Sequence, residues 1–216
     1  MSWLASMKLD YETVARERLT DSYRWHKAAW KAFPGVEKKS TDANKNRTPF
    51  LSRINPSYYD VELLILSGLK PECPAWCPEN CFRLTEIRPD FLSHDHYLFD
   101  LYANPTRKVK KPNLDGSFTR HGNRLAILDP SKQMEWLNRK ALESGFILSQ
   151  RLQLEIISGN SHSFTKEGKR GLHIGVRFKG LLEVCDHDLF TKAFHQGIGS
   201  AKGFGFGMLI IKPIII

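Results

Sequence analysis

Residues 197–207 restrict the fold of this chain more than any other stretch of its sequence. They read Gly-Ile-Gly-Ser-Ala-Lys-Gly-Phe-Gly-Phe-Gly, with five glycines, one lysine and two phenylalanines. Glycine allows positive φ angles and a close approach of the backbone to another molecule, at a cost in chain entropy. Three interpretations follow: a structural turn, a contact with nucleic acid, or a mononucleotide site in which backbone N–H groups and Lys202 hold phosphate.

The sequence around these glycines argues against the known nucleotide-binding motifs. A P-loop or a dinucleotide fingerprint follows a strand and opens a helix. Here a helical pattern, residues 188–196, precedes the glycines, and an apolar run, residues 208–211, follows them. Neither Gly-Lys-Ser nor Gly-Lys-Thr occurs. If the stretch binds a polyanion, the candidate contacts are Gly199, Lys202, Gly203 and Gly205.

Charge and length indicate a basic chain with a polyanionic partner. Its 216 residues include 32 Lys and Arg against 23 Asp and Glu, which gives a net charge of +9. Such a balance favours RNA, DNA or an acidic membrane surface. The apolar C-terminus is interrupted by Lys212 and Pro213, too short for a membrane span, and the N-terminus lacks a signal-peptide pattern. We therefore expect a cytoplasmic protein without a membrane partner.

The order of strand and helix patterns predicts an α+β fold of two tandem ferredoxin-like (RAMP/RRM-like) domains, residues 1–90 and 91–216. The second helix of the first domain is uncertain, because a Pro- and Cys-rich segment stands in its place. In the first half we expect strands at 2–9, 50–54, 61–66 and 82–87 and a helix at 21–33. In the second half we expect strands at 97–102, 125–128, 152–157, 173–184 and 208–211, and helices at 129–145 and 188–196.

The predicted helix at 21–33 carries the candidate catalytic residues. At 100° per residue, Tyr23, His26, Trp30 and Phe33 fall within about one quarter of the helical wheel. A basic stripe runs beside them and contains Arg24, Lys27 and Lys31. Tyr23 and His26 are either part of a buried aromatic face or, beside that stripe, groups that act on a phosphate.

Two basic segments are candidate phosphate-binding arms. The segment 107–124 has one acid against six basic residues: Arg107, Lys108, Lys110, Lys111, Arg120 and Arg124. The polar connection that we expect at 159–171 adds Lys166, Lys169 and Arg170. Such runs are either solvated loops or, in a basic protein, contacts with nucleic-acid phosphates.

The cysteines favour structural thiols over a metal site. Cys73, Cys77 and Cys81 are spaced by three residues, whereas zinc sites commonly use Cys-x2-Cys pairs with a second pair further along. The segment His94-Asp95-His96 is weak evidence for a metal site on its own. We predict neither a metal ion nor a cofactor.

Four stretches carry a resemblance to a known family. Residues 22–35 resemble a Tyr-x-x-His-x-x-x-Trp-x-x-Phe-Pro helix, and 50–53, Phe-Leu-Ser-Arg, resemble the strand after it. Residues 99–106 contain an Ala-Asn-Pro segment, and 196–207 match a glycine-loop signature. Together, and in this order, they resemble the CasE family of CRISPR RAMP proteins, the repeat-RNA endoribonucleases of the type I-E Cascade complex. The chain departs from the family at 10–19, which is long and charged, and at the Pro/Cys segment 71–81.

The resemblance implies an activity and roles for the residues that match. Family members cut the CRISPR repeat RNA at the 3′ base of its stem-loop without a metal ion: a ribose 2′-OH attacks the adjacent phosphate and the 5′-oxygen leaves. On this basis His26 takes one of the two proton-transfer roles, Tyr23 orients the phosphate or the hydroxyl, and Lys27 and Lys31 stabilise charge. The implied partners are the crRNA stem-loop and other Cascade subunits. The alternatives are a non-catalytic RAMP subunit that only holds RNA, and an RNA-binding module unrelated to CRISPR.

Overall fold

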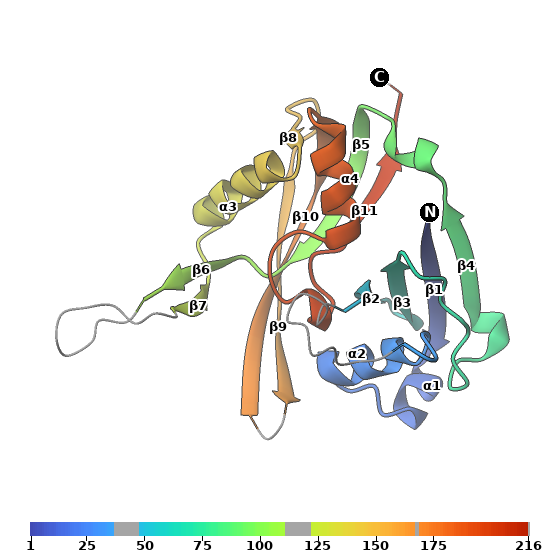
Figure 1. Cartoon of the computed structure of the whole chain (residues 1–216). Helices are drawn as coiled ribbons and strands as arrows, with labels where there is room; N and C mark the ends of the chain where they lie inside the picture. Colours follow the sequence, from blue (N-terminus) through green and yellow to red (C-terminus); the bar gives the residue numbers. More distant parts are fainter. Residues whose placement is uncertain (37–47, 111–121, 167–168, 216) are drawn as a thin grey trace.

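The computed structural model describes residues 1–36, 48–110, 122–166 and 169–215. In the first half of the chain, the described residues form four strands, two short helices and two 3-10 turns (Figure 1). In chain order these are β1 (Ser2–Asp10), α1 (Tyr11–Arg16), α2 (Ser22–Trp30), β2 (Phe50–Pro56), β3 (Asp60–Ser67), η1 (Glu79–Cys81), β4 (Phe82–Ile87) and η2 (Pro89–Leu92).

The second half repeats the same plan with an added hairpin. Its elements are β5 (His96–Ala103), β6 (Thr106–Val109), β7 (Asn123–Ala126), α3 (Pro130–Glu143), β8 (Phe146–Leu148), β9 (Glu155–Lys166), β10 (Lys169–Val184), α4 (His187–Gln196), η3 (Lys202–Phe204) and β11 (Leu209–Pro213). Among the residues that the structure describes, strands β6 and β7 form a separate two-stranded sheet, which projects from the body of the molecule (Figure 1).

Both halves have the strand order of a ferredoxin-like unit. The first sheet is antiparallel with the order β2-β3-β1-β4, and the second has the order β11-β5-β10-β8, with β9 also paired to β10. In each, the first and third long strands lie at the centre and the last strand of the unit forms an edge. The predicted pair of ferredoxin-like folds is therefore confirmed. The domain boundary at residue 90 stays a prediction.

Helix α2 begins where a cap residue satisfies its first N–H groups. The side chain of Asp21 accepts hydrogen bonds from the backbone of Tyr23 and Arg24, both at 2.9 Å. Free N–H groups at a helix start require such acceptors, and Asp is among the preferred residues. The helix packs Trp25, Ala28 and Ala29 on the core beneath the first sheet. The opposite side of α2 is left open to other contacts.

The Pro/Cys segment takes the place of a second helix in the first half. Residues 68–81 are all described and form no α-helix, only the short turn η1. The indole of Trp76 is buried and donates to the carbonyl of Ala28 at 3.2 Å, and the N–H of Glu72 donates to Ala32 at 2.9 Å. These bonds satisfy carbonyls at the C-terminal end of α2, so the segment supports that helix without being one.

Several predicted elements of the chain need correction. Residues 11–16 form α1, which was not expected; Asp10 caps it by accepting from Thr13 N–H at 2.7 Å. The expected polar connection at 159–171 consists mostly of β9 and β10, and the expected strand at 152–157 begins only at Glu155. Strand β7 spans Asn123–Ala126 instead of 125–128, and β8 was missed. Backbone pairing across a hairpin does not require apolar side chains, so the polar parts of β9 and β10 lack the alternation that reveals a half-buried strand. Strand β8 is apolar, but its three residues are too few to show a period.

A buried ion pair joins the two sheets. Arg53 of β2 is 2% exposed, and its guanidinium donates to Oδ1 and to the carbonyl oxygen of Asp100 in β5, at 2.8 and 3.0 Å. Arg177 of β10 binds the same carboxylate from the other side. Burial alone would raise the pKa of Asp100, but the bonds and charges of Arg177 and Arg53 outweigh it, so the pKa lies below its usual value. A buried arginine without such a partner is strongly unfavourable.

Candidate active site

The glycine stretch and helix α2 meet in the folded chain. The turn η3, which contains Lys202 and Gly203, contacts both α2 and β2. A methyl group at Gly203 would lie 3.6 Å from Cε1 of His26 and 4.0 Å from Oγ1 of Thr48. Since ordinary van der Waals contact begins near this distance, His26 faces the backbone of the glycine stretch. The predicted catalytic histidine and Gly203 therefore belong to one site.

The ring of His26 is held by two aromatic neighbours. Nε1 of Trp30, one turn further along α2, donates a hydrogen bond to Nε2 of His26 at 3.0 Å. The His26 and Phe50 rings lie 5.7 Å apart. The indole is a donor only, so this bond requires a lone pair on Nε2 and places the proton of a neutral His26 on Nδ1. Nδ1 is also the nitrogen nearer to Gly203, at 3.9 Å from the position of a methyl group there.

A polar hollow adjoins the surroundings of His26, because it is lined by Phe50, whose ring lies against His26, and by Gly203, which His26 faces. It has a volume of about 440 Å³ and contains Lys202. Its remaining lining residues are Thr48, Pro49, Phe50, Leu51, His195, Gln196 and Gly203. Lys202 is half-buried there, which strengthens its interaction with an anion relative to a fully solvated lysine. The hollow therefore offers positive charge next to an imidazole.

Tyr23 and Lys27 of α2, with Lys31 at its C-cap, form a second group of candidate residues. The ammonium of Lys27 lies over the Tyr23 ring, 4.6 Å from its centre. Lys27 and Lys31 line a separate hollow together with Arg18, Arg24 and Trp76. The structure thus groups Lys202 and Gly203 with His26, and Tyr23 with Lys27. A cation over an aromatic ring is a stable arrangement in itself.

Four of the five glycines in the stretch are required by the backbone. Gly197, Gly199, Gly205 and Gly207 have φ between +73° and +90°, a region that other residues enter only with strain. Gly207 leaves no room for a side chain either, since a methyl group would lie 2.5 Å from the carbonyl oxygen of Ile198. Gly203 has no positive φ. The structural interpretation therefore accounts for four glycines, whereas Gly203 is the one set against His26.

The glycine stretch is tied to the Ala-Asn-Pro segment. The N–H of Gly207 donates to the carbonyl of Tyr102 at 2.7 Å, and Ser200 Oγ donates to the carbonyl of Asn104 at 3.1 Å. Two of the sequence stretches that carried the resemblance are therefore in direct contact. Their hydrogen bonds fix where η3 sits relative to the second sheet.

Sequence reasoning missed a cluster of histidines and aromatic rings behind η3. His162 and Phe164 of β9 and His173 of β10 pack with Phe204 and Phe206 of the glycine stretch. Burial lowers the pKa of both His162 and His173 below the usual value, and for His173 the neighbouring His162 lowers it further. The alternation of His162 with Phe164 was a usable signal, but the serines and threonines around them obscured it.

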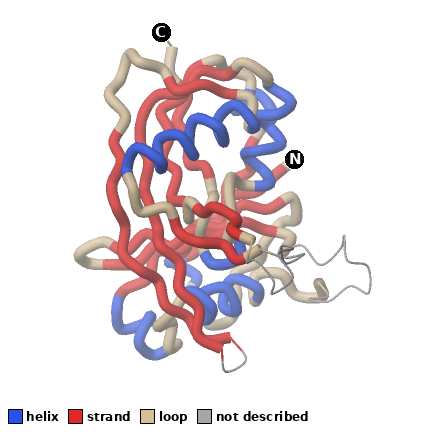
Figure 2. Tube along the Cα trace, turned by 90° about the vertical axis from the view of Figure 1, so that its left-hand side faces the viewer, coloured by secondary structure: helices blue, strands red, loops and turns tan. Residues whose placement is uncertain are grey.

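The basic arms are placed as the sequence suggested only in part. Arg107, Lys108, Lys110 and Arg124 are exposed on or beside the β6–β7 hairpin. Lys111 and Arg120 lie outside the described residues. Lys166, Lys169 and Arg170 lie at the end of the β9–β10 hairpin, which extends from the second sheet to the side of α2 (Figure 2), and β9 contacts α2. One arm therefore ends near the site, and the other projects away from it.

The thiols and the His-Asp-His segment show other contacts. Cys77 is buried, and burial, with Cys73 and Cys81 nearby, raises its pKa to about 12. Asp95 lies 3.3 Å from Nε2 of His187, and His96 lies 3.9 Å from Glu183. Among the residues that the structure describes, no group of three or more His, Cys, Asp or Glu side chains is arranged to hold a metal ion. None of the described helices is long and apolar enough to cross a membrane.

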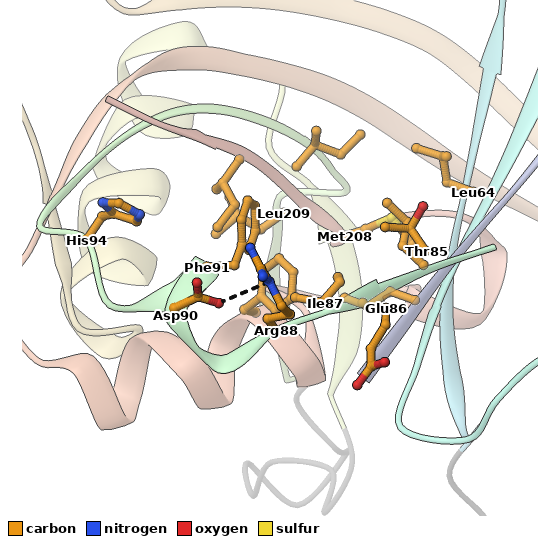
Figure 3. Close-up of a pocket in the computed structure, with 15 residues that line it drawn as sticks. Leu64, Thr85, Glu86, Ile87, Arg88, Asp90, Phe91, His94, Met208 and Leu209 are labelled. Atoms are coloured by element: carbon orange, nitrogen blue, oxygen red, sulfur yellow. Dashed lines mark ion pairs between the residues drawn. The ribbon is translucent and has the colours of Figure 1, made fainter. Parts of the chain in front are cut away.

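An apolar groove of about 380 Å³, which His26 does not line, is shown in Figure 3. Leu64, Ile87, Phe91 and Leu209 line it, with the exposed pair of Arg88 and Asp90, 3.6 Å apart, at its rim. None of the predicted catalytic or RNA-binding residues lines this groove. The candidate site is therefore the more polar region around His26, Gly203 and Lys202.

Comparison with known proteins agrees with this fold. The model of the family described as "CRISPR associated protein" matches residues 2–213. The chain belongs to this family of CRISPR-associated proteins. It is 24% identical over 214 residues to the "CRISPR system Cascade subunit CasE" of Escherichia coli K12, covering 96% of this chain and 100% of the relative. It is 25% identical over 226 residues to the "CRISPR-associated endoribonuclease Cse3" of Thermus thermophilus, covering 98% and 100%.

Solved structures of such proteins have the same fold. A structure of Cse3 bound to a 19 nt RNA superimposes with a TM-score of 0.72 and 24% identity, covering 99% of this chain and 100% of that one. The crystal structure of Cas6e from E. coli K-12 gives a TM-score of 0.70 at 22% identity, again covering 99% and 100%. A chain of a CRISPR RNA-guided surveillance complex gives 0.68 at 20% identity, covering 98% and 100%. Family membership removes the alternative of an RNA-binding module unrelated to CRISPR.

Proposed function

We propose that this chain is a metal-independent endoribonuclease that cleaves CRISPR precursor RNA at the 3′ base of the repeat stem-loop. It stays bound to the mature crRNA as a subunit of Cascade and acts in the cytoplasm. The names of its relatives, a Cascade subunit and an endoribonuclease, support this assignment. The observation that carries it is the position of His26, an imidazole held against the glycine stretch beside Lys202.

The reaction needs few groups, and the site supplies candidates for them. The 2′-OH loses its proton as it attacks the adjacent phosphorus, and the 5′-oxygen gains a proton as its bond to phosphorus breaks. His26 takes part in one of these transfers, because imidazole exchanges protons near neutral pH. Lys202 and the backbone N–H groups around Gly203 offset the charge that builds up on the phosphate oxygens.

Tyr23, Lys27 and Lys31 contribute from the neighbouring side of α2. Tyr23 orients the phosphate or the hydroxyl, and Lys27 and Lys31 attract the strand that carries it. The cation over the Tyr23 ring keeps the phenol in a defined orientation. Because Lys27 and Lys31 line a separate hollow from Lys202, their charge acts on flanking phosphates.

The basic arms bind the stem-loop. A-form RNA is recognised mainly through its backbone and shape, and affinity rises with the number of phosphate contacts. Arg107, Lys108 and Lys110, together with Lys111 and Arg120, form one arm; Lys166, Lys169 and Arg170 form the other. The contacts of Gly199, Gly203 and Gly205 with RNA complete the binding surface. Residues 1–90 then act as the catalytic domain and residues 91–216 as the main RNA-binding domain.

The test compares cleavage and binding by variants of the full chain. His26→Ala should lose about 10²–10⁴-fold in the single-turnover rate of repeat-RNA cleavage while its Kd for the RNA stays near that of wild type. His94→Ala, an exposed histidine in the groove of Figure 3, is the matched control and should cut normally. EDTA should change nothing, and a 2′-deoxy substitution at the scissile nucleotide should block wild type.

Two outcomes would contradict the proposal. If wild type binds the repeat RNA tightly but never cuts it, the chain is a non-catalytic RAMP-type subunit that only holds RNA. If His26→Ala folds and cuts at the wild-type rate, another group is the catalyst. Loss of folding in His26→Ala, measured by its melting curve, would assign His26 to the aromatic packing around Phe50.

A further inference from the structure

The turn η3 has little structure of its own to fix its position. It is a single 3-10 turn closed by the bond from Phe204 N–H to the carbonyl of Ala201, at 2.9 Å. Left-handed residues flank it on both sides: Ala201 with φ +60° and Gly205 with φ +90°. A one-turn segment of this kind gains few backbone bonds, so contacts of its side chains decide where it lies. Gly203, which faces His26, is in the middle of it.

Phe204 anchors this turn to the long hairpin of the second half. Its ring lies 4.3 Å from that of Phe164 on β9 and 4.9 Å from that of His173 on β10, measured between centres. Phe164 and His173 are themselves stacked, at 4.8 Å. Two of these separations lie within the range of about 4.5–7 Å for favourable aromatic contacts, and Phe204 and Phe164 are closer still. Phe204 therefore completes a three-ring cluster.

Phe206 makes a second anchor two residues further on. Its ring stacks on Tyr102 at 5.1 Å and contacts His162 at 5.5 Å. Hydrogen bonds hold the two histidines in place: the Tyr102 hydroxyl with Nε2 of His162 at 2.5 Å, and the Asn104 amide with Nδ1 of His173 at 3.1 Å. The rings that receive Phe204 and Phe206 are thus fixed by polar bonds to β5 and the Ala-Asn-Pro segment.

We propose that Phe204 is a positioning residue for RNA cleavage, held between Phe164 and His173 so that Gly203 and Lys202 are set against His26. This inference rests on the proposed function. It makes the β9–β10 hairpin, whose far end carries Lys166, Lys169 and Arg170, the support of the active site as well as an RNA-binding arm. The phosphate is then presented to His26 in a position that the hairpin defines.

The size of the expected effect follows from the geometry of proton transfer. A displacement of about 1 Å between reacting groups can cost on the order of 10²-fold in rate. Removal of the Phe204 ring takes away its packing on Phe164 and on His173 at once, and the turn has no other aromatic group within it. Binding should change little, because it depends on many phosphate contacts on other segments. Removal of the Phe204 ring should therefore lower the rate of RNA cleavage without changing the affinity for RNA.

The experiment measures Phe204→Ala with repeat RNA at saturating protein. We expect the single-turnover rate to fall about 10- to 100-fold, with Kd within about twofold of wild type. Phe204→Trp, which restores a ring, should recover most of the rate. The matched control is Phe91→Ala: Phe91 is also a partly buried phenylalanine, but it packs on Tyr97 and Phe194, and its removal should lower the melting temperature without changing the rate.

A second readout does not depend on cleavage. The ring resonances of His26, observed by ¹H–¹³C NMR on the protein without RNA, should shift in Phe204→Ala and stay unchanged in Phe91→Ala. If Phe204→Ala does not fold, Phe204→Leu takes its place in both measurements. A wild-type protein that never cuts would end the proposed function, while the NMR comparison would still test the positioning of His26.

Two results would overturn the inference. One is a wild-type rate and unchanged His26 resonances in folded Phe204→Ala, which would mean that η3 holds its place without the ring. The other is a raised Kd with a normal rate at saturation, which would mean that Phe204 contacts RNA directly.

Discussion

The indole N–H of Trp30 is bonded to Nε2 of His26, 3.0 Å away, so one of the two ring nitrogens of the candidate catalytic group is already occupied within α2. The bond can form only when Nε2 carries no proton. The bond therefore fixes both the tautomer of the neutral ring and the orientation of that ring in the site. Trp30 and His26 are four residues apart, the spacing at which side chains on one helix face meet.

Trp30→Phe should slow cleavage, because the ring of His26 loses the hydrogen bond that orients it. A neutral hydrogen bond contributes about 0.5–1.5 kcal/mol, which corresponds to a change of roughly 2- to 10-fold in the single-turnover rate. Trp25→Phe, in the core on the same helix, should lower stability and leave the rate of the folded protein unchanged. An identical rate for Trp30→Phe and wild type would contradict this role.

Substitutions at Gly203 and at Gly205 should have different effects, the first on cleavage and the second on stability. Gly203→Val should fold with nearly the wild-type melting temperature but lose cleavage, because the added methyl groups extend toward His26, 3.6 Å from the Cβ position. Gly205→Ala should instead cost about 1–2 kcal/mol in stability, since its φ of +90° is unfavourable for any L-residue. Urea unfolding and single-turnover cleavage separate the two. The expectation fails if Gly203→Val melts early and its folded fraction handles RNA normally.

The contribution of the β6–β7 arm to RNA binding should be measurable in the salt dependence of the Kd. Replacing Arg107 and Lys108 by Ala should lower the slope of log Kd against log salt by about 0.7–0.9 for each RNA phosphate that these side chains neutralise in the wild type. Both residues are exposed, so folding should not change. Lys70→Ala with Lys212→Ala, two exposed lysines outside the arms, is the control. Equal slopes in both double variants would place the stem on another surface.

Asp100→Asn should destabilise the protein strongly and in a pH-dependent way. It leaves the buried charge of Arg53 without its partner, which costs about 3–5 kcal/mol. The folded pKa of Asp100 is lowered, so its contribution is complete above the usual value of 3.8 and disappears as the pH falls through the folded value. The free energies of unfolding of wild type and Asp100→Asn should therefore begin to converge below pH 3.8 and meet only as the pH falls through the lower, folded pKa of Asp100.

Urea titrations at pH 7 and at a series of pH values below 3.8 measure this difference. Asp60→Asn is the control, because Asp60 forms a surface pair with Lys8 at 3.3 Å, and such pairs contribute about 0–1 kcal/mol. A constant gap between wild type and Asp100→Asn at all pH values would show that the carboxylate charge is not what stabilises the pair.

Local patterns in the sequence were enough to predict helices α2, α3 and α4 and the long apolar strands. Asp21 before an aromatic helix and Asp129-Pro130 before another are strong start signals, and both helices begin there. The twofold repeat of strand and helix patterns then limited the fold to a pair of ferredoxin-like units. Helix α1 was missed because its six residues are too few for a clear period.

Only part of the candidate site could be predicted from the sequence. Tyr23, His26 and Trp30 share a helix, so their spacing alone places them on one side of it. That Gly203 and Lys202 belong with His26, and Lys27 and Lys31 with another hollow, depends on contacts between segments far apart in the chain. So do the pairing of Arg53 with Asp100 and the packing of Phe204 on the β9–β10 hairpin. Periodicity describes one element at a time, whereas these contacts arise when two sheets dock and bury groups that no single segment can partner.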